Sequence, residues 1–242
     1  MRAAFYNHLG LGDHFIHFGY ISEICKAKKY DEIHITTFPH YIPVLKRLYS
    51  IIANAGIKVV FKEVSNHNEG VNYVRSFDGD KHCCWWYGFT GNDIIENLSY
   101  SLKGIPSSKR YSNFREAVNF ARDEEKESRI FKELVGDDYS YIFVADDPLR
   151  NYNIDKSFFP NDCKIIKSCN YLHYDPIDLL KVMELSKQYH CMYSSFFFFF
   201  DQYKDDITFS GSEIHLHESY VKKVFTDSKH HLFFSKRNIR YH

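Results

Sequence analysis

The first 64 residues alternate between strand-like and helix-like patterns of apolar positions. Between short apolar runs, residues 15–28 and 41–55 place apolar side chains every three or four positions, as a helix with one buried face does. Gly56 follows the second helix, where a C-terminal cap is expected. Three strands are predicted: residues 2–6, which form a short apolar run, residues 32–36, in which apolar and polar positions alternate, and residues 57–64. Strands and helices in this order are typical of a parallel α/β layer.

A second α/β series begins after residue 138. Its predicted strands are residues 139–145, 164–167, 189–193 and 214–216. Residues 175–187 are expected to form a helix, with Asp175 as the N-cap and a proline directly after it. Residues 196–203 are expected to form another helix. It opens with five consecutive phenylalanines, which predict burial between the sheet and neighbouring helices, with a membrane-touching patch as the alternative.

A highly charged stretch separates the two series. Residues 114–134 are dense in Lys, Arg, Asp and Glu, and we expect them to form one long exposed helix. We therefore predict a domain junction near this helix, with domains at residues 1–120 and 121–242.

The composition and charge of the chain exclude some classes of protein. The 242 residues contain 31 Lys and Arg against 31 Asp and Glu, so the chain lacks the basic surplus of most nucleic-acid-binding proteins. Aromatic residues make up 18% of the chain, which excludes disorder as its general state. We predict no nucleic-acid partner, and the sequence leaves the oligomeric state open.

The sequence also indicates the cellular compartment in which the protein is expected. It holds no run of 18 apolar residues that could span a bilayer, and its first residues lack the apolar core of a signal peptide. The six cysteines include no CxxC pair. These features predict a cytoplasmic protein without a transmembrane segment, whose cysteines stay reduced.

The sharpest motif is HLGLGDH, which runs from His8 to His14 between a predicted strand and a predicted helix. Gly10 and Gly12 would allow a tight turn and a close approach of a ligand to the helix N-terminus. The motif lacks the third glycine of a dinucleotide fingerprint and the GK[ST] of a Walker A loop. Asp13 could cap the helix or, with His8 and His14 on either side, act as a general base.

Paired carboxylates follow a strand of the second series. Asp146 and Asp147 come directly after residues 139–145, and Arg150 lies close behind them. Ligands of doubly wound sheets bind beyond the carboxyl ends of the strands, so this group could bind a metal-bound phosphate. Alternatively, it forms a turn that is held by a salt bridge.

Two serines lie at the next strand-to-helix transition. Ser194 and Ser195 precede the phenylalanine run, where hydroxyl and amide groups suit a phosphate or simply cap the helix. A nucleophilic serine is disfavoured, because the GxSxG elbow is absent. In the basic C-terminal tail, Lys236 or Arg237 could reach a diphosphate or remain solvated.

Other clusters carry weaker signals. His215 and His217 would share one face of a strand and could supply two metal ligands, but the tighter grouping of a zinc site is missing, and we predict no metal. Three consecutive aromatic residues could stack on a sugar or a base, or could pack in the core. They are Trp85, Trp86 and Tyr87.

Taken together, these motifs resemble a family. The strand that ends in His8, the GLGD turn and the following helix resemble the start of GT-B glycosyltransferases of the heptosyltransferase type. The whole chain is similar to small glycosyltransferase-like proteins of bacteria and large viruses. The matching parts are the HLGLGDH opening, the charged middle helix, a YIFV-x-DD strand end and an hC-x-SSF element, here residues 8–14, 114–134, 141–147 and 190–196. The late D-[ST]-G-P-x-H motif of heptosyltransferases is absent.

The resemblance implies a compact α/β fold with two Rossmann-like domains that face each other across a cleft. Residues 1–120 would bind a glycan or other hydroxyl acceptor, and residues 121–242 a nucleotide-sugar donor. Asp13 would be the base on the acceptor hydroxyl, in a catalytic group with His8 and His14. The implied donor-binding residues are Asp146, Asp147, Arg150, Ser194, Ser195 and Lys236. The implied acceptor-binding residues are Gly10, Gly12, Trp85, Trp86 and Tyr87.

The implied reaction is a single displacement with inversion that needs neither a metal nor another cofactor. A non-catalytic module that binds a nucleotide or a glycan is the main alternative. A Rossmann-type oxidoreductase is weakened by the missing third glycine, and a structural or scaffold role would leave the protein without a ligand.

Overall fold

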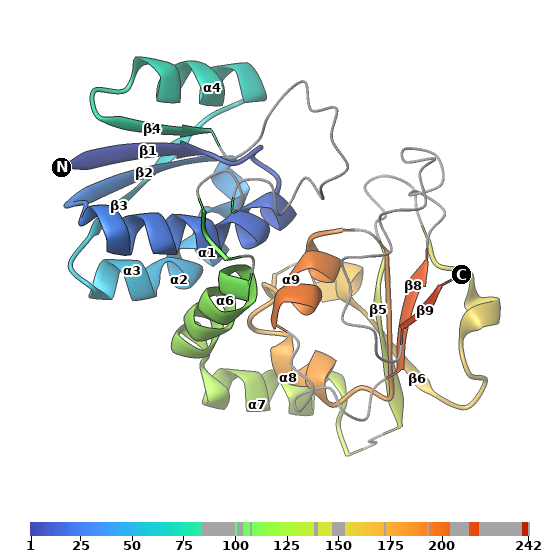
Figure 1. Cartoon of the computed structure of the whole chain (residues 1–242). Coiled ribbons are helices and arrows are strands. Elements are labelled where there is room, and N and C mark those ends of the chain that lie inside the picture. The colour runs from blue at the N-terminus through green and yellow to red at the C-terminus, as the bar shows by residue number, and fades with distance from the viewer. Residues whose placement is uncertain are drawn as a thin grey trace. The chain divides into compact units, whose positions relative to one another are not determined.

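The computed structural model shows an α/β protein whose chain divides into two compact units, Met1–Ala121 and Arg122–His242 (Figure 1). The expected α/β class is confirmed. The structure describes residues 1–83, 100, 104–106, 108–137, 140–146, 153–171, 173–192, 194–203, 213–217 and 239–241.

The first unit is built on a four-stranded parallel sheet in the order β3-β2-β1-β4. Its strands are β1 (Arg2–Tyr6), β2 (Glu32–Thr37), β3 (Lys58–Glu63) and β4 (Asp80–Cys83). The three strands predicted from the sequence are present. The sequence did not indicate β4, because its four residues are mostly polar and pair with a neighbour on one side only.

Helices lie on both faces of this sheet (Figure 1). The elements are α1 (Leu11–Lys28), the 3₁₀ turn η1 (Pro39–Tyr41), α2 (Ile42–Leu48), α3 (Ser50–Asn54), α4 (His67–Ser76) and α6 (Ser108–Ala121). The expected helix at residues 41–55 is interrupted at Tyr49, which separates α2 from α3. Gly56 ends this region with a φ of +88°, which a residue with a side chain rarely adopts.

Close packing with α6 fixes the position of α1. A Cβ atom on Gly19 would lie 2.5 Å from the backbone oxygen of Lys109, so the two helices meet where α1 has no side chain. The Tyr100 hydroxyl donates a hydrogen bond to the carbonyl of Ile16 and accepts one from the backbone N–H of Tyr20, both at 2.8 Å. These contacts hold the helix whose first turn carries the HLGLGDH motif.

The second unit contains a five-stranded parallel sheet in the order β6-β5-β7-β8-β9. Its strands are β5 (Tyr141–Ala145), β6 (Lys164–Lys167), β7 (Gln188–Met192), β8 (Glu213–His217) and β9 (Ile239–Tyr241). The four strands predicted in this half are present, and β9 is an addition. The central strand β5 is buried along its whole length, as its apolar sequence predicts.

The expected single charged helix at residues 114–134 is wrong, because two helices occupy this region. In the described part of the second unit the helices are α7 (Glu124–Leu134), α8 (Leu180–Glu184) and α9 (Ser195–Tyr203), with 3₁₀ turns η3 (Lys156–Phe158) and η4 (Ser168–Tyr171). Asp123 accepts a hydrogen bond from the backbone N–H of Lys126 and begins α7, so α6 and α7 are separate elements. The expected exposure holds for many of the charged positions, but α6 also buries apolar side chains such as Phe114 and Val118.

Two expectations near α8 and α9 have different outcomes. Asp175 caps a turn by accepting from the backbone N–H groups of Ile177 and Asp178, but the regular helix is shorter than expected and starts at Leu180. The phenylalanine run forms α9, which packs against β7, and three of its five rings are buried.

Among the described residues, no helix combines the length and the apolar character that a membrane crossing requires. The described cysteines are free thiols.

Candidate functional site at the start of α1

The loop between β1 and α1 has an unusual backbone. His8 and Leu9 have φ values of 60° and 59°, in the left-handed region that residues with side chains seldom occupy. The backbone N–H of Gly10 closes the loop by donating to the carbonyl of His8 at 2.8 Å. The tight turn therefore depends on two non-glycine residues, whereas the sequence had indicated the two glycines. Strain of this kind is concentrated at functional sites.

Gly10 has a different role from the expected one. Its φ of −68° is ordinary, but a Cβ atom at this position would lie 2.5 Å from Oδ2 of Asp13. The missing side chain makes room for the Asp13 carboxylate beside the loop. Gly12 is buried in the first turn of α1.

Asp13 projects from the first turn of α1 at the carboxyl end of β1, the edge of a parallel sheet where ligands bind. Its side chain is 20% exposed, and Oδ2 lies 3.4 Å from Nδ1 of His8, whose side chain is 30% exposed. The positive end of the helix dipole also favours a negative charge here. The structure thus brings Asp13 and His8 together as a partly exposed carboxylate–imidazole pair.

His67 joins this pair and was missed by the sequence analysis. It is the first residue of α4, and its ring stacks on the His8 ring with centroids 4.5 Å apart. The sequence did contain one feature that could have indicated His67, a capping pattern at the start of α4. Asn66 accepts a hydrogen bond from the backbone N–H of Glu69, and the Glu69 carboxylate accepts one from the backbone N–H of Ser65. A capping pattern of this type predicts a helix that begins at His67.

His14 lies in the interior, not at the surface of the site. It is 0% exposed, and Asn7 donates to its Nδ1 at 2.9 Å. On the next turn, buried His17 donates from Nδ1 to the carbonyl of Asp13 at 2.8 Å. The structure thus does not place His14 beside the partly exposed Asp13–His8 pair, and its expected catalytic role stays a prediction. Both histidines support the turn that carries Asp13.

Burial keeps these two histidines neutral. Desolvation, with a smaller contribution from the charge of His17, lowers the pKa of His14 to about 3. Desolvation also lowers the pKa of His17 to about 4, against an opposing effect of Asp13. In each ring, Nε2 has no hydrogen-bond partner among the described residues.

These pKa values predict acid sensitivity of the first unit. Below pH 6.5 the unfolded chain protonates His14 and His17 while the folded chain does not, so the stabilisation is complete above pH 6.5 and is lost as the pH falls toward 4. Between pH 7.5 and 5, the free energy of unfolding should fall by about 2 kcal/mol for each histidine. Urea unfolding of the wild type and of His17→Gln at both pH values measures this.

The control is His173→Gln, since His173 is exposed. This variant should keep the pH dependence of the wild type, whereas His17→Gln should lose part of it. An unchanged pH dependence in His17→Gln would contradict the assignment of a buried neutral imidazole.

In the second unit, Asp146 is a structural residue. Its carboxylate is fully buried, with Oδ2 2.5 Å from Nζ of Lys167 and Oδ1 accepting from the backbone N–H of Ile154. Asp146 is thus held by an ion pair with Lys167 of β6 rather than by a residue of the following turn, and its expected contact with a donor stays a prediction. Asp147 and Arg150 lie outside the described residues.

The two serines lie at the start of α9, as the sequence indicated. The carbonyl of Ser194 accepts from the backbone N–H of Phe198 at 3.1 Å, which places Ser194 at the N-cap and Ser195 at the first helical position. Oγ of Ser194 is buried and has no hydrogen-bond partner in the described part of the chain. Both serines remain candidates for contacts with a donor. Lys236, Trp85, Trp86 and Tyr87 lie outside the described residues.

Histidines also cluster on the sheet of the second unit. His215 and His217 share a face, as expected, and His190 of β7 lies beside them, its Nδ1 3.1 Å from Nε2 of His217. The rings of His190 and His215 stack at 4.3 Å. The rings thus contact one another, and no three His, Cys, Asp or Glu side chains of the described ranges are arranged to hold a metal ion.

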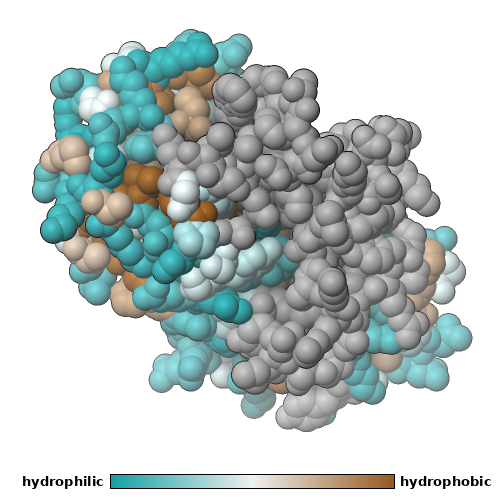
Figure 2. All heavy atoms as spheres, in the orientation of Figure 1, coloured by the Kyte–Doolittle hydropathy of each residue, from teal (hydrophilic) through white to brown (hydrophobic). Residues whose placement is uncertain are grey.

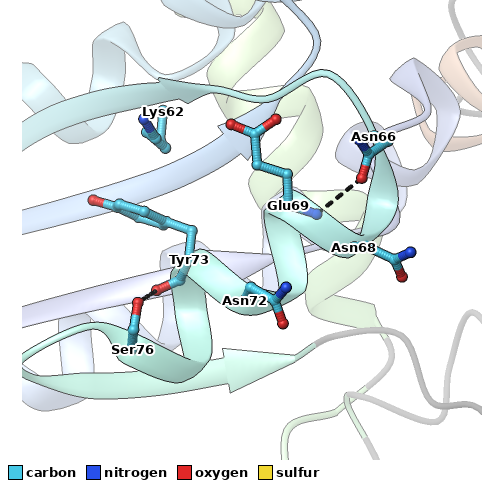
Figure 3. A pocket seen from close by; sticks show the side chains of 7 residues that line it. All are labelled: Lys62, Asn66, Asn68, Glu69, Asn72, Tyr73 and Ser76. Atoms are coloured by element: carbon cyan, nitrogen blue, oxygen red, sulfur yellow. Dashed lines mark hydrogen bonds between the residues drawn. The ribbon is translucent and has the colours of Figure 1, made fainter.

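A pocket on the surface of the first unit runs along α4 (Figure 3). Its lining is polar: Lys62, Asn66, Asn68, Glu69, Asn72, Tyr73 and Ser76. Nζ of Lys62 lies 5.5 Å from the centre of the Tyr73 ring and covers one aromatic face. On the side drawn in Figure 2, the described surface is mainly hydrophilic. The pocket therefore shows no open aromatic platform, and the group at the start of α1 remains the stronger candidate.

Comparisons with protein-family models, with curated proteins and with solved structures gave no match.

Proposed function

We propose that this protein is a glycosyltransferase that moves a sugar from a nucleotide-sugar donor to a hydroxyl group of a glycan or other acceptor. The proposal includes inversion of configuration, independence of metals and a compact GT-B arrangement of two Rossmann-like domains across a cleft. The observation that carries it is Asp13, a partly exposed carboxylate in the first turn of α1, 3.4 Å from His8 and beyond the carboxyl end of β1.

Asp13 has the properties of a general base for a hydroxyl group. An ionised carboxylate accepts hydrogen bonds and can take the proton of an alcohol as its oxygen becomes a nucleophile. In the proposed reaction, the acceptor oxygen bonds to the anomeric carbon while the bond from that carbon to the diphosphate breaks. The proton passes to Asp13, whose Oδ2 lies 3.4 Å from Nδ1 of the His8 imidazole.

The leaving group needs stabilisation of its negative charge. The N-terminus of α9 offers backbone N–H groups, and Oγ of Ser194 is a buried hydroxyl without a hydrogen-bond partner in the described part of the chain. We assign the diphosphate of the donor to this helix start, with Ser195 as a further hydroxyl.

A thermal-shift experiment tests donor binding. At a concentration 100 times its dissociation constant, a matching nucleoside diphosphate (from UDP, GDP, CDP, ADP and dTDP) should stabilise the folded protein by about 2.7 kcal/mol. The double variant Ser194→Ala/Ser195→Ala should lose most of the shift. The control Ser112→Ala, at an exposed position of α6, should keep it.

Each outcome separates the alternatives. If no nucleotide in the panel shifts the unfolding midpoint, the donor site is contradicted. A shift without sugar transfer to any acceptor supports the non-catalytic binding protein. A fluorescence titration that shows binding of NAD(H) would favour an oxidoreductase.

A further inference from the structure

Two imidazole rings from separate elements meet beside Asp13. His8 belongs to the loop after β1 and His67 to the first turn of α4, and their rings stack at 4.5 Å with an interplanar angle of 28°. The hydroxyl of Tyr6, at the end of β1, lies 2.8 Å from Nδ1 of His67. The Phe38 ring meets His67 edge-on at 6.3 Å. Contacts with His8, Tyr6 and Phe38 thus fix the orientation of the His67 ring.

These contacts also determine the chemistry of His67. Burial, and in second place the neighbouring His8, lower its pKa against an opposing effect of Asp13, which favours the neutral ring. A neutral imidazole nitrogen is a better acceptor than a phenolic oxygen, so we assign Tyr6 as the donor to Nδ1. The ring proton then resides on Nε2. This atom makes no hydrogen bond to a described residue, and the ring is only half-buried. His67 therefore offers one fixed N–H donor.

The Nε2–H group of His67 and the carboxylate of Asp13 have complementary roles in hydrogen bonding. Asp13 accepts hydrogen bonds only, whereas Nε2 of His67 donates only. Two neighbouring hydroxyl groups on a sugar ring match this pair, because one can donate to the carboxylate while the oxygen of the other accepts from the imidazole. A phosphate in this place would be repelled by Asp13.

We propose that His67 is a ligand-binding residue that, together with Asp13, recognises a vicinal diol of the acceptor sugar. This inference rests on the proposed function and specifies its acceptor. Asp13 takes the proton of the reacting hydroxyl, and Nε2–H of His67 donates to the oxygen of the adjacent hydroxyl. A sugar that lacks this second hydroxyl leaves the His67 donor without a partner.

The test is a titration of the full chain with methyl α-D-mannopyranoside, methyl β-D-galactopyranoside and methyl α-D-glucopyranoside. Binding is followed by NMR of ¹⁵N-labelled histidine side chains. We expect at least one glycoside to shift the Nε2 signal of His67. The affinity of the His67→Ala variant for that glycoside should be about tenfold lower, which is the effect of one hydrogen bond. His67→Gln should recover most of this loss through its amide N–H, and the control His173→Ala should match the wild type.

Deoxy glycosides separate a binding role from a structural one. The analogue without the hydroxyl that His67 contacts should bind wild type and His67→Ala equally, whereas a merely structural role would weaken every analogue alike. If His67→Ala is poorly folded, two other measurements decide whether His67 binds the glycoside: the shift of the wild-type Nε2 signal and the affinities of His67→Gln.

Two results overturn the inference in distinguishable ways. Unchanged glycoside affinity in both His67 variants contradicts it while leaving the proposed function intact, because donor binding and the Asp13 base are measured separately. If no glycoside shifts the His67 signal in the wild type, the diol assignment is wrong even where a nucleoside diphosphate binds.

Discussion

Replacing Asp13 by asparagine is expected to lower the rate of sugar transfer by a factor of about 10²–10⁴, the usual contribution of a general base. The amide has nearly the same shape as the carboxylate but cannot take the proton of the acceptor. In the described structure the carboxylate lies 3.4 Å from His8 and beside Gly10, and the amide fits the same space, so few packing contacts change. Release of nucleoside diphosphate from a donor that the thermal-shift screen identifies measures the rate.

Folding should survive this substitution. A carboxylate in the first turn of a helix contributes about 0.3–1 kcal/mol through the helix dipole, so Asp13→Asn should lower the unfolding midpoint only slightly. The matched control is Asp78→Asn, because the Asp78 side chain is fully exposed, and its transfer rate should equal that of the wild type. Full transfer activity in Asp13→Asn would show that Asp13 is a helix-stabilising residue and not the base.

Replacing Arg122 by methionine is expected to give the largest loss of stability, about 3 kcal/mol in the second unit. The guanidinium group donates to both oxygens of Glu127 at 3.0 and 2.7 Å and to Glu184 at 2.9 Å. It also donates to the hydroxyl of Tyr203 at 2.9 Å. Glu127 is 1% exposed, so removal of the cation leaves a buried carboxylate next to a second one.

Urea unfolding followed by circular dichroism measures this effect. Arg129→Met is the matched control, since Arg129 is an exposed arginine on α7, the helix that begins just after Arg122, and its free energy of unfolding should stay within about 0.5 kcal/mol of the wild type. The double variant Arg122→Met/Glu127→Gln should recover part of the loss, because it removes the stranded charge. Equal stability of Arg122→Met and wild type would show that the ion pairs contribute nothing.

The sequence predicted the α/β architecture well where local patterns matched the final environment. The predicted strand at residues 32–36 corresponds to β2, and residues 164–167 coincide with β6. Short segments of this kind, in which apolar and polar positions alternate or a few apolar residues stand together, predict strands. The phenylalanine run was interpreted correctly as a buried helix, since no solvent-exposed helix tolerates that many aromatic rings.

The sequence failed where a single side chain decided the path of the chain. Asp123 begins a new helix inside a charged stretch whose composition suits one continuous helix. Periodicity averages over many residues, whereas a helix start depends on one hydrogen bond. For the same reason the short polar strand β4 and the start of α4 at His67 left little trace in the hydrophobic pattern.

The candidate site was also predicted in part. HLGLGDH identified Asp13 and His8, because a carboxylate and a histidine that flank a strand-to-helix turn lie at the ligand-binding edge of the sheet. It could not reveal that His14 points inward, since the sequence does not show which face of the helix is covered. Likewise, Asp146 was recognisable as a carboxylate at a strand end, but its pairing with Lys167 of β6 depends on a contact across the sheet.

By itself, the sequence determined the α/β class, most strands and the location of one candidate functional loop, because these follow from local periodicity and from residue types that are close in the chain. Only the tertiary structure decided which residues share that loop. His67 lies 59 positions after His8 along the chain (67 − 8), yet their rings stack because β1 and α4 pack together. Local patterns fix the elements, whereas the side chains that meet between them depend on how those elements pack.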